Sequence, residues 1–597
     1  MRDPAPSRAR SGLWRAGLLA VLGLVLVTAG PFILDTYSVN ILVRSFLYGC
    51  IAVTVDVLWG FTGILSFGQS AFFAIGAYAL GLASSQLGLS PAVAGGALLG
   101  GLAAAGLVAA LVGWLAFAYG VSPLYVSIVT LVLSIIFVQV IYAGGDFTGS
   151  SSGLSNFETF DLSTESWFRL AGVALVAVTL LGWIFVRSDA GRLLVAIREN
   201  EQRCAYFGVP VALVKTTLLA GAAMVAALAG YAYAGYTDVI APDLGNFQFG
   251  TELVIWVALG GRGTLLGPAV AAVVIDFVSA YLSGSLPFVW QLVVGAVFIA
   301  VIVLMPQGLG PALVALPRQL RRRSTAAPPS VQLVPAMEEQ AVAAGGPAVT
   351  VTNLARRYGS LHVLEDISFT GHRGELVSLV GPNGAGKTTL IRCIADGHER
   401  SAGRVAIQGT EIGRMPPERC VRLGLGRKFQ APNVFDALTV AESLRVARTL
   451  HERLSSWRRA DAVHLPQAAM HVVRATGLDA QLGTEVRHLS HGAKQALELA
   501  MVLAMEPTVL LLDEPTAGLT GAERRRIGGI LAELVRQHAL CVLLIEHDLE
   551  FVREISSRIV VLHQGRIVLD GSVEQVVRSE LVRTIYTGEP QALGEVA

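Results

Sequence analysis

Long apolar stretches fill the first half of this 597-residue chain, whereas the second half alternates apolar and charged positions. Only 26 of the 89 Lys, Arg, Asp and Glu residues lie in residues 1–316. Nearly every apolar stretch there is long enough to cross a bilayer as a helix. We therefore expect a polytopic α-helical membrane domain followed by a soluble domain. The expected spans lie near 18–34, 40–58, 61–83, 92–118, 122–143, 168–186, 213–236, 252–282 and 288–305.

The first apolar stretch follows Arg2, Arg8, Arg10 and Arg15, a pattern that a signal peptide and a first membrane helix share. The lack of a clear A-x-A cleavage site and the many later spans favour a helix with a cytoplasmic N-terminus. Six crossings then return the chain to the cytoplasm at the charged segment 187–215.

The stretch 252–282 must enter the membrane and return to the same side, so that 213–236 can lead out of the cytoplasm and 288–305 can lead back into it. It contains GGRG at 260–263 and then Pro268. We interpret it as a broken or re-entrant pair of short helices, which requires that its irregular backbone be buried in protein or line a cavity. One long tilted helix is the alternative.

Charged residues inside apolar stretches are costly and therefore mark candidate positions on a translocation path. Asp56 and Asp276 are the candidates, whereas Glu252 lies close to the end of a span, where an interfacial position is the simpler interpretation. Ser66, Gln69 and Ser70 would supply hydrogen-bond donors and acceptors to a neutral amide solute, whereas a zwitterion would call for charged groups or helix ends.

The soluble half contains G-x-x-x-x-G-K-[ST] between the strand-like ELVSLV (375–380) and a helix-like segment. In this P-loop, backbone N–H groups and the helix N-terminus hold phosphate, Lys387 reaches the β- and γ-phosphate oxygens, and the Thr388 hydroxyl binds Mg²⁺. ATP and Mg²⁺ are therefore the predicted cofactors. The loop residues are Gly381, Pro382, Asn383, Gly384, Ala385, Gly386, Lys387, Thr388 and Thr389.

A second apolar run, TVLLLDEP (508–515), ends in two carboxylates. A buried parallel strand presents such residues at the ligand edge of its sheet. We expect Asp513 to bind Mg²⁺ and Glu514 to polarise the attacking water.

Composition excludes two other classes of function. The net charge of +1 gives no basic excess for nucleic acid. The five cysteines are scattered without ligand spacing and indicate neither a disulfide framework nor a zinc site.

Residues 349 to about 588 resemble the nucleotide-binding domain of ABC transporters. The resemblance implies that Tyr358 stacks on adenine, that Gln430 in GRKFQ is the Q-loop glutamine and a Mg²⁺ ligand, and that His547 is the switch histidine. LSHGAKQ (489–495) resembles the signature that binds the γ-phosphate held by an opposing domain, through Ser490 and Gly492. His491, Ala493 and Thr520 depart from the common family pattern.

The membrane half resembles permeases of branched-chain amino acid and urea or amide importers. Its resemblance rests on WGFTGILSFGQSAFFAIGAY (59–78) and on GRLLVAIRENEQRCAYFGVPVALVK (191–215), which is similar to a cytoplasmic coupling segment. We expect this segment to dock near Gln430. VIWVALGGRGTLLG (254–267) and GRKFQ resemble the urea type, so urea or a short amide is the first expected solute and a branched-chain amino acid the second.

The expected domains are a permease at 1–316, a flexible linker at 317–347, an ABC ATPase at 348–590 and a tail at 591–597. We expect a multi-pass subunit of a bacterial inner-membrane importer with its ATPase domain in the cytoplasm. One P-loop and one signature per chain imply a second ATPase and permease, as a heteromer or a homodimer, and the family implies a periplasmic solute-binding protein. An exporter half is the alternative, disfavoured by the short cytoplasmic segments.

Overall fold

The computed structural model describes residues 8–118, 123–285, 289–305, 308, 331–336 and 345–587. The chain divides into two compact units. The first contains 1–194, 211–329 and 456–458, and the second contains 195–210, 330–455 and 459–597. The short segment 195–210, which comes from the sequence of the membrane half, thus belongs to the ATPase unit.

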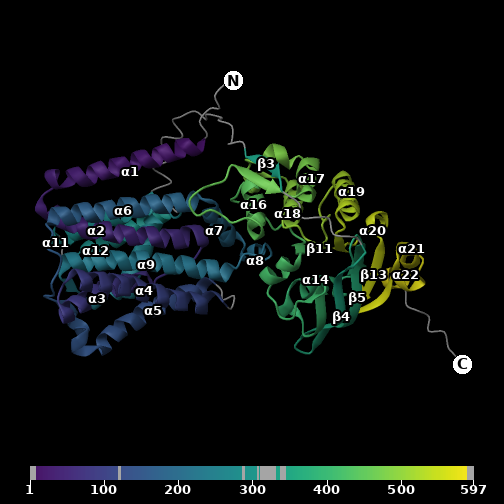
Figure 1. Cartoon of the computed structure of the whole chain (residues 1–597), viewed down its shortest axis with the longest axis horizontal. Coiled ribbons are helices and arrows are strands. Elements are labelled where there is room, and N and C mark those ends of the chain that lie inside the picture. The colour runs from purple at the N-terminus through teal and green to yellow at the C-terminus, as the bar shows by residue number, and fades with distance from the viewer. Residues whose placement is uncertain are drawn as a thin grey trace, which may run out of the picture. The chain divides into compact units, whose positions relative to one another are not determined.

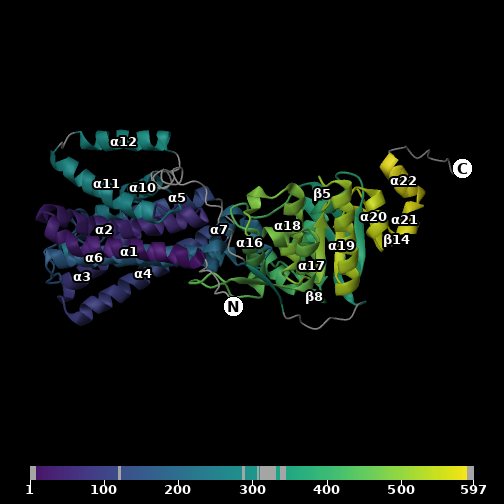
Figure 2. The same ribbon diagram turned by 90° about the horizontal axis from the view of Figure 1, so that it is seen from above.

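The first unit is a bundle of apolar helices, and seven helices of the described residues are long and apolar enough to cross a membrane. In Figure 1, α2, α6 and α9 lie lengthwise side by side, and Figure 2 shows α12 beside α11. The main helices are α1 (Arg8–Ile33), α2 (Thr36–Asp56), α3 (Gln69–Leu87), α4 (Pro91–Phe117), α5 (Pro123–Ala143), α6 (Thr164–Arg187), α9 (Val211–Thr237), α10 (Phe247–Gly260), α11 (Leu266–Ser285) and α12 (Trp290–Leu304).

The stretch predicted to be broken is two helices, α10 and α11, joined by a turn at 261–265. This finding excludes one long tilted helix. Asp56 holds the turn, because its Oδ1 accepts a hydrogen bond from Gly263 N at 2.6 Å and its Oδ2 accepts one from Leu265 N at 2.8 Å. Backbone groups freed by the break are thereby satisfied inside the protein.

Small residues let α3 and α9 approach closely. A Cβ built on Gly76 would lie 1.8 Å from Ala227 O, and one built on Gly230 would lie 1.8 Å from Phe73 O. Each glycine faces the backbone of the other helix, so a residue with a side chain larger than that of glycine would not fit at either position.

The second unit is built on a six-stranded sheet of order β14-β13-β6-β12-β11-β9, with β14 antiparallel and the other neighbours parallel. An antiparallel sheet of order β5-β4-β7-β8 lies in the same unit. The strands are β4 (Pro347–Tyr358), β5 (Leu361–His372), β6 (Leu376–Val380), β7 (Ala402–Ile407), β8 (Thr410–Glu411), β9 (Leu425–Lys428), β11 (Val509–Asp513), β12 (Cys541–Ile545), β13 (Arg558–His563) and β14 (Arg566–Ser572).

Helices cover this core, and β6, β11 and β12 are buried along their whole length, as expected of central parallel strands. The longer helices of the unit are α14 (Lys387–Ala395), α16 (Val440–Ala447), α17 (Gln467–Ala475), α18 (His491–Leu503), α19 (Gly521–His538) and α22 (Glu580–Thr587). Two shorter ones are α8 (Glu201–Ala205) and α20 (Leu549–Ile555).

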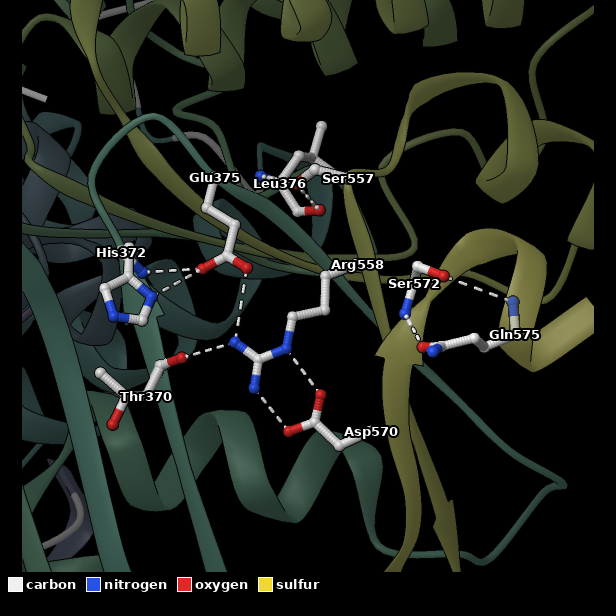
Figure 3. A network of polar contacts seen from close by, with 9 residues as sticks. All are labelled: Thr370, His372, Glu375, Leu376, Ser557, Arg558, Asp570, Ser572 and Gln575. Atoms are coloured by element: carbon white, nitrogen blue, oxygen red, sulfur yellow. Dashed lines mark hydrogen bonds and ion pairs between the residues drawn. The ribbon is translucent and has the colours of Figure 1, made fainter. Parts of the chain in front are cut away.

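A polar network fixes the C-terminal strands at the amino ends of β6 and β13, the sheet edge opposite the P-loop (Figure 3). The Arg558 guanidinium pairs with Asp570, lies 3.4 Å from Glu375 Oε1 and donates to Thr370 O at 2.9 Å. Its Nη2 lies 2.5 Å from Asp570 Oδ2, and its Nε donates to Oδ1 at 2.6 Å. These partners raise the pKa of Arg558, led by the hydrogen bond to Asp570. The network joins β13 to β14, to β5 and to the residue before β6.

The predicted linker contains a short strand, which its Pro- and Ala-rich composition did not indicate. Strand β3 (Gln332–Pro335) pairs in parallel with β10 (Ala462–Leu465) of the second unit. Backbone hydrogen bonds from Gln332 N to Asp461 O and from Ala336 N to Leu465 O extend the pairing at both ends. The rest of the predicted linker up to residue 344, apart from residues 331 and 336, lies outside the described residues.

Candidate functional site

The P-loop connects β6 directly to α14, as the sequence pattern predicted. Its turn depends on glycine, because Gly381, Gly384 and Gly386 have φ angles of 151°, 81° and 101°. The buried Lys387 ammonium donates to Gly381 O at 2.7 Å and to Pro382 O at 3.0 Å. Burial lowers the pKa of Lys387, although the nearby Glu514 and Asp513 oppose that shift. A phosphate would give this ammonium the anionic partner that the loop carbonyls only partly replace.

Asp513, at the end of β11, faces the first turn of α14. Its Oδ1 lies 3.4 Å from the Thr388 hydroxyl. Burial raises the pKa of Asp513, and the charge of Arg427 opposes that shift. A carboxylate beside a hydroxyl is the oxygen donor set that Mg²⁺ prefers, so the residues present fit this ion.

Glu514 brings together the three residues predicted to act in catalysis. Gln430 Nε2 donates to Glu514 Oε2 at 2.8 Å, and His547 Nε2 lies 2.7 Å from Oε1. These residues come from three loops at the carboxyl ends of β9, β11 and β12. Parallel strands present such loops at one sheet edge, which explains how residues far apart in the sequence meet.

The backbone of Glu514 is left-handed, with φ of 48°, an uncommon conformation for a residue other than glycine. Its N–H donates to Ile545 O at 3.0 Å. The following loop is held by Glu546, a buried residue that sequence reasoning missed, whose Oε1 accepts hydrogen bonds from Thr516 N at 3.1 Å and Thr516 Oγ1 at 2.7 Å. Burial raises the pKa of Glu546, and these hydrogen bonds oppose that shift. The position of Glu546 directly before His547 could have indicated its role in the sequence.

The signature residues begin α18, where the Ser490 hydroxyl accepts the hydrogen bond of Ala493 N as the N-cap. A Cβ on Gly492 would lie 2.4 Å from Glu523 Oε1, and one on Gly518 would lie 3.2 Å from His491 Nε2. The signature therefore lies against the loop that follows Glu514.

Three further residues singled out in the sequence, Thr520, Tyr358 and Thr389, have distinct surroundings. Thr520 caps α19 in a capping box with Glu523. Threonine and aspartate both serve as N-caps, so the departure from the family pattern keeps this local role. Tyr358 ends β4, is 45% exposed and has the Arg356 guanidinium 4.2 Å from its ring centroid. Its exposure fits a surface for stacking. Thr389 lies in the first turn of α14.

The coupling segment contacts the part of the ATPase unit that leads to Gln430, as expected. Arg203 Nη1 donates to Arg427 O at 2.8 Å. Glu199 accepts the hydrogen bond of Ala437 N at 2.9 Å. Burial raises the pKa of Glu199, and the Ala437 hydrogen bond opposes that shift.

Asp56, Ser66, Gln69 and Asp276, the four predicted path residues, each have different hydrogen-bond partners. Asp56 holds the turn between α10 and α11, as described above. Ser66 Oγ accepts the hydrogen bond of Gly68 N at 3.4 Å. The buried Gln69 accepts the Thr54 hydroxyl at 3.4 Å, and its Nε2 has no hydrogen-bond partner among the described residues.

Asp276 instead pairs with Arg44, which sequence reasoning missed although it interrupts an apolar stretch. Arg44 Nη2 lies 3.1 Å from Asp276 Oδ1, and the Ser45 hydroxyl donates to Oδ2 at 2.6 Å. The Arg44 guanidinium also lies 5.8 Å from the ring centroid of Tyr48, and that ring stacks on Tyr233 at 6.0 Å. The pair thus joins α2 to α11 beside an aromatic cluster.

Taken together, the P-loop, the acidic strand end and the capped signature helix define a nucleotide-binding ATPase of the ABC class. Residues 364–517 match the family described as ABC transporter, and residues 37–302 match the permease component of the branched-chain amino acid transport system. The chain belongs to the family of branched-chain amino acid ABC transporters and carries permease and ATPase in one polypeptide.

The relatives align with the ATPase half. The high-affinity branched-chain amino acid transport ATP-binding protein LivG of Escherichia coli is 34% identical over 254 residues, 41% of this chain and 98% of LivG. BraF of Pseudomonas aeruginosa, which has the same description, is 32% identical over 252 residues, 41% of this chain and 98% of BraF. An ATP-binding cassette crystallised in its ADP conformation covers 41% of this chain and 100% of its own, with 23% identity and a TM-score of 0.36.

The two family matches, the relatives LivG and BraF, and the apolar helices show that the chain is a membrane protein, an ATP hydrolase and an importer subunit. Nothing in the comparisons supports the exporter alternative.

Proposed function

We propose that the chain uses MgATP to import a small polar solute, with the permease at 1–316 and the ATPase at 348–590. The observation that carries the ATPase assignment is the contact of Gln430 and His547 with the two oxygens of Glu514. A carboxylate held by two partners is oriented to polarise water, while Gln430 and His547 sense the γ-phosphate. Thr388, Asp513 and Gln430 would hold Mg²⁺, Tyr358 would stack on adenine, and the P-loop would hold the phosphates.

Glu514→Gln tests this assignment. The change removes the carboxylate that orients water and leaves the P-loop intact, so ATP turnover should fall below detection while nucleotide binding persists. Turnover would be measured as phosphate release and binding with a fluorescent ATP analogue. An ATPase rate within about threefold of that of the natural protein would correspond to a change of less than about 1 kcal/mol in the activation barrier and would refute the proposed role of Glu514.

For the solute, we propose a branched-chain amino acid first and urea or a short amide second, which reverses the order expected from sequence motifs. The permease family and the relatives LivG and BraF carry that amino acid in their descriptions. The Arg44–Asp276 pair supports the same order, because a cation and an anion suit the carboxylate and ammonium of a zwitterion.

Membrane vesicles that contain the transporter assembly, enclose ATP and are supplied with the solute-binding protein on the outside would discriminate between the solutes. Uptake of labelled leucine that exceeds uptake of labelled urea, and that Arg44→Gln abolishes, is the expected result. Urea uptake without leucine uptake would overturn the proposed order and leave the importer assignment standing.

We also propose that the active assembly contains a second permease, a second ATPase and a periplasmic solute-binding protein, in the bacterial inner membrane with the N-terminus and the ATPase in the cytoplasm. An ATP sandwich needs the P-loop of one domain and the signature of another, and this chain carries one of each. A heteromeric partner pair is favoured by the resemblance to family members with two different permeases. Purification of an active homodimer would overturn that choice.

A further inference from the structure

The coupling segment inserts a completely buried arginine into the ATPase unit. Arg203, on α8, is 0% exposed, and its guanidinium lies 4.5 Å from the ring centroid of Phe207. Burying an arginine is costly unless a specific partner compensates it. The role of Arg203 therefore depends on which groups meet its guanidinium.

Those groups come from two different parts of the ATPase. Arg203 Nη1 donates to the carbonyl of Arg427 on β9, and the same nitrogen lies 3.5 Å from Glu498 Oε1 on α18. β9 ends two residues before Gln430, and α18 begins directly after Ser490. One guanidinium thus contacts both the strand that leads to the Q-loop and the helix that starts at the signature.

Glu498 is shared between two cations. It is also 0% exposed, and its Oε2 lies 3.5 Å from the Nζ of Lys428, a residue that is only 1% exposed. The Oε1 atom also accepts the hydrogen bond of Phe429 N at 3.2 Å. A third cation, Arg427, donates from Nη1 to the Tyr206 hydroxyl at 2.9 Å. Glu498 is therefore the carboxylate that Arg203 and Lys428 share, while the charge of Arg427 also interacts with that of Asp513.

Several polar atoms of this buried cluster have no hydrogen-bond partner among the described residues, namely Arg203 Nε, Arg203 Nη2 and Glu498 Oε2. Burial lowers the pKa values of Arg203 and Lys428, and Glu498 opposes both shifts. A buried ionic cluster contributes little to stability compared with apolar packing. The cluster instead fixes the position of α8, because Glu498 is the carboxylate that pairs with Arg203.

We propose that Arg203 is a positioning residue for ATP hydrolysis, which sets the place of Gln430 and of the signature helix by holding β9 and α18 to the coupling segment. The proposal rests on the proposed roles of Gln430 and Ser490. In this proposal, the coupling segment helps to complete the ATP site.

Two substitutions separate position from charge, because each removes one cation from the same carboxylate. Arg203→Met leaves Glu498 with Lys428 and Phe429 N, so the ATPase unit should stay folded while the coupling segment loses its attachment. Lys428→Met is the matched control, since it removes the same charge but leaves Arg203 with Glu498 and Arg427 O. Arg203→Lys keeps the charge and loses the forked geometry of the guanidinium, so it should rescue only partly.

The experiment compares the transporter assembly, purified through a tag on this chain, in lipid nanodiscs. Arg203→Met should lower kcat for ATP at least tenfold, with KM for ATP within about threefold and the melting temperature within about 3 °C of the natural protein. Lys428→Met should keep kcat within about threefold. A kcat of Arg203→Met within about twofold of the natural protein, or an equal loss in Lys428→Met, would overturn the proposal.

A thiol crosslink reports the position of the segment without relying on catalysis. The charges of Glu199 and Asp436 interact, and the five natural cysteines are all buried, so cysteines introduced at these two positions should react with a short bismaleimide. The crosslink should form in the parent and Lys428→Met proteins and be reduced severalfold in Arg203→Met. An undiminished crosslink in Arg203→Met would count against the proposal. Active Glu514→Gln protein would instead refute the proposed ATP site.

Discussion

The close crossing of α3 and α9 leads to a prediction whose size follows from the structure. In Gly76→Ala, the added Cβ would lie 1.8 Å from Ala227 O, whereas ordinary contact begins at about 3.4 Å. The obstacle is backbone, which a side-chain rotation cannot relieve. The helices would therefore have to separate by roughly 1.5 Å, breaking contacts that bury Phe73 and Ala223.

Overpacking of this kind costs about 1–3 kcal/mol. For a domain of a few hundred residues, each kcal/mol lowers the melting temperature by about 2–4 °C, so we expect a loss of roughly 2–12 °C. Gly221→Ala is the matched control, because Gly221 lies on α9 with no atom within 4 Å of its built Cβ. Alanine is the better helix former by about 1 kcal/mol, so this variant should be neutral or slightly more stable.

The assay is size-exclusion chromatography of the detergent-solubilised protein after heating, with the folded fraction followed by fluorescence. Gly230→Ala, which would meet Phe73 O, should behave like Gly76→Ala. Melting temperatures of Gly76→Ala and Gly221→Ala within about 2 °C of each other would show that the α3–α9 approach is not limiting and would refute the reasoning.

Three further predictions concern the second unit. Lys387→Ala should weaken nucleotide affinity and turnover together, because it removes the phosphate contact; unchanged affinity for a fluorescent ATP analogue would contradict that contact. Burial raises the pKa of Asp513 in nucleotide-free protein. The folded state therefore holds this proton more tightly than the unfolded state, and the contribution of Asp513 to stability falls as pH rises from its ordinary pKa through its raised pKa. Asp513→Asn should therefore raise the melting temperature near neutral pH, with a smaller gain as pH falls toward 4, and a gain independent of pH would count against this cause. Val334→Pro removes a backbone donor from β3 and should speed hydrogen exchange at 462–465, whereas exchange unchanged by the substitution would show that the β3–β10 pairing contributes nothing.

The P-loop and the carboxylates of Asp513 and Glu514 could be predicted from the sequence pattern because they lie at the ends of apolar strands, whereas Gln430 and His547 were predicted from the family resemblance. The P-loop is contiguous, and Asp513, Glu514 and His547 follow strands that are parallel and buried. Parallel order alone brings such strand ends to one edge, so the contacts of Glu514 with Gln430 and His547 follow from topology. The break at 252–282 could be predicted for a similar reason, since GGRG interrupts the apolar run.

Residues whose role depends on a distant partner could not be found in this way. Arg203 stands in a charged segment, where charge usually indicates solvent, and only the fold shows it fully buried against Glu498. Asp276 was found as a costly charge, but its partner Arg44 is 232 positions away and lies in a stretch interpreted as uniformly apolar. In both cases the sequence indicates a charge that would be costly to bury, but it does not identify the residue that compensates that charge. A buried charge therefore indicates that a partner exists, and only the packing of α8 on α18, or of α2 on α11, identifies it.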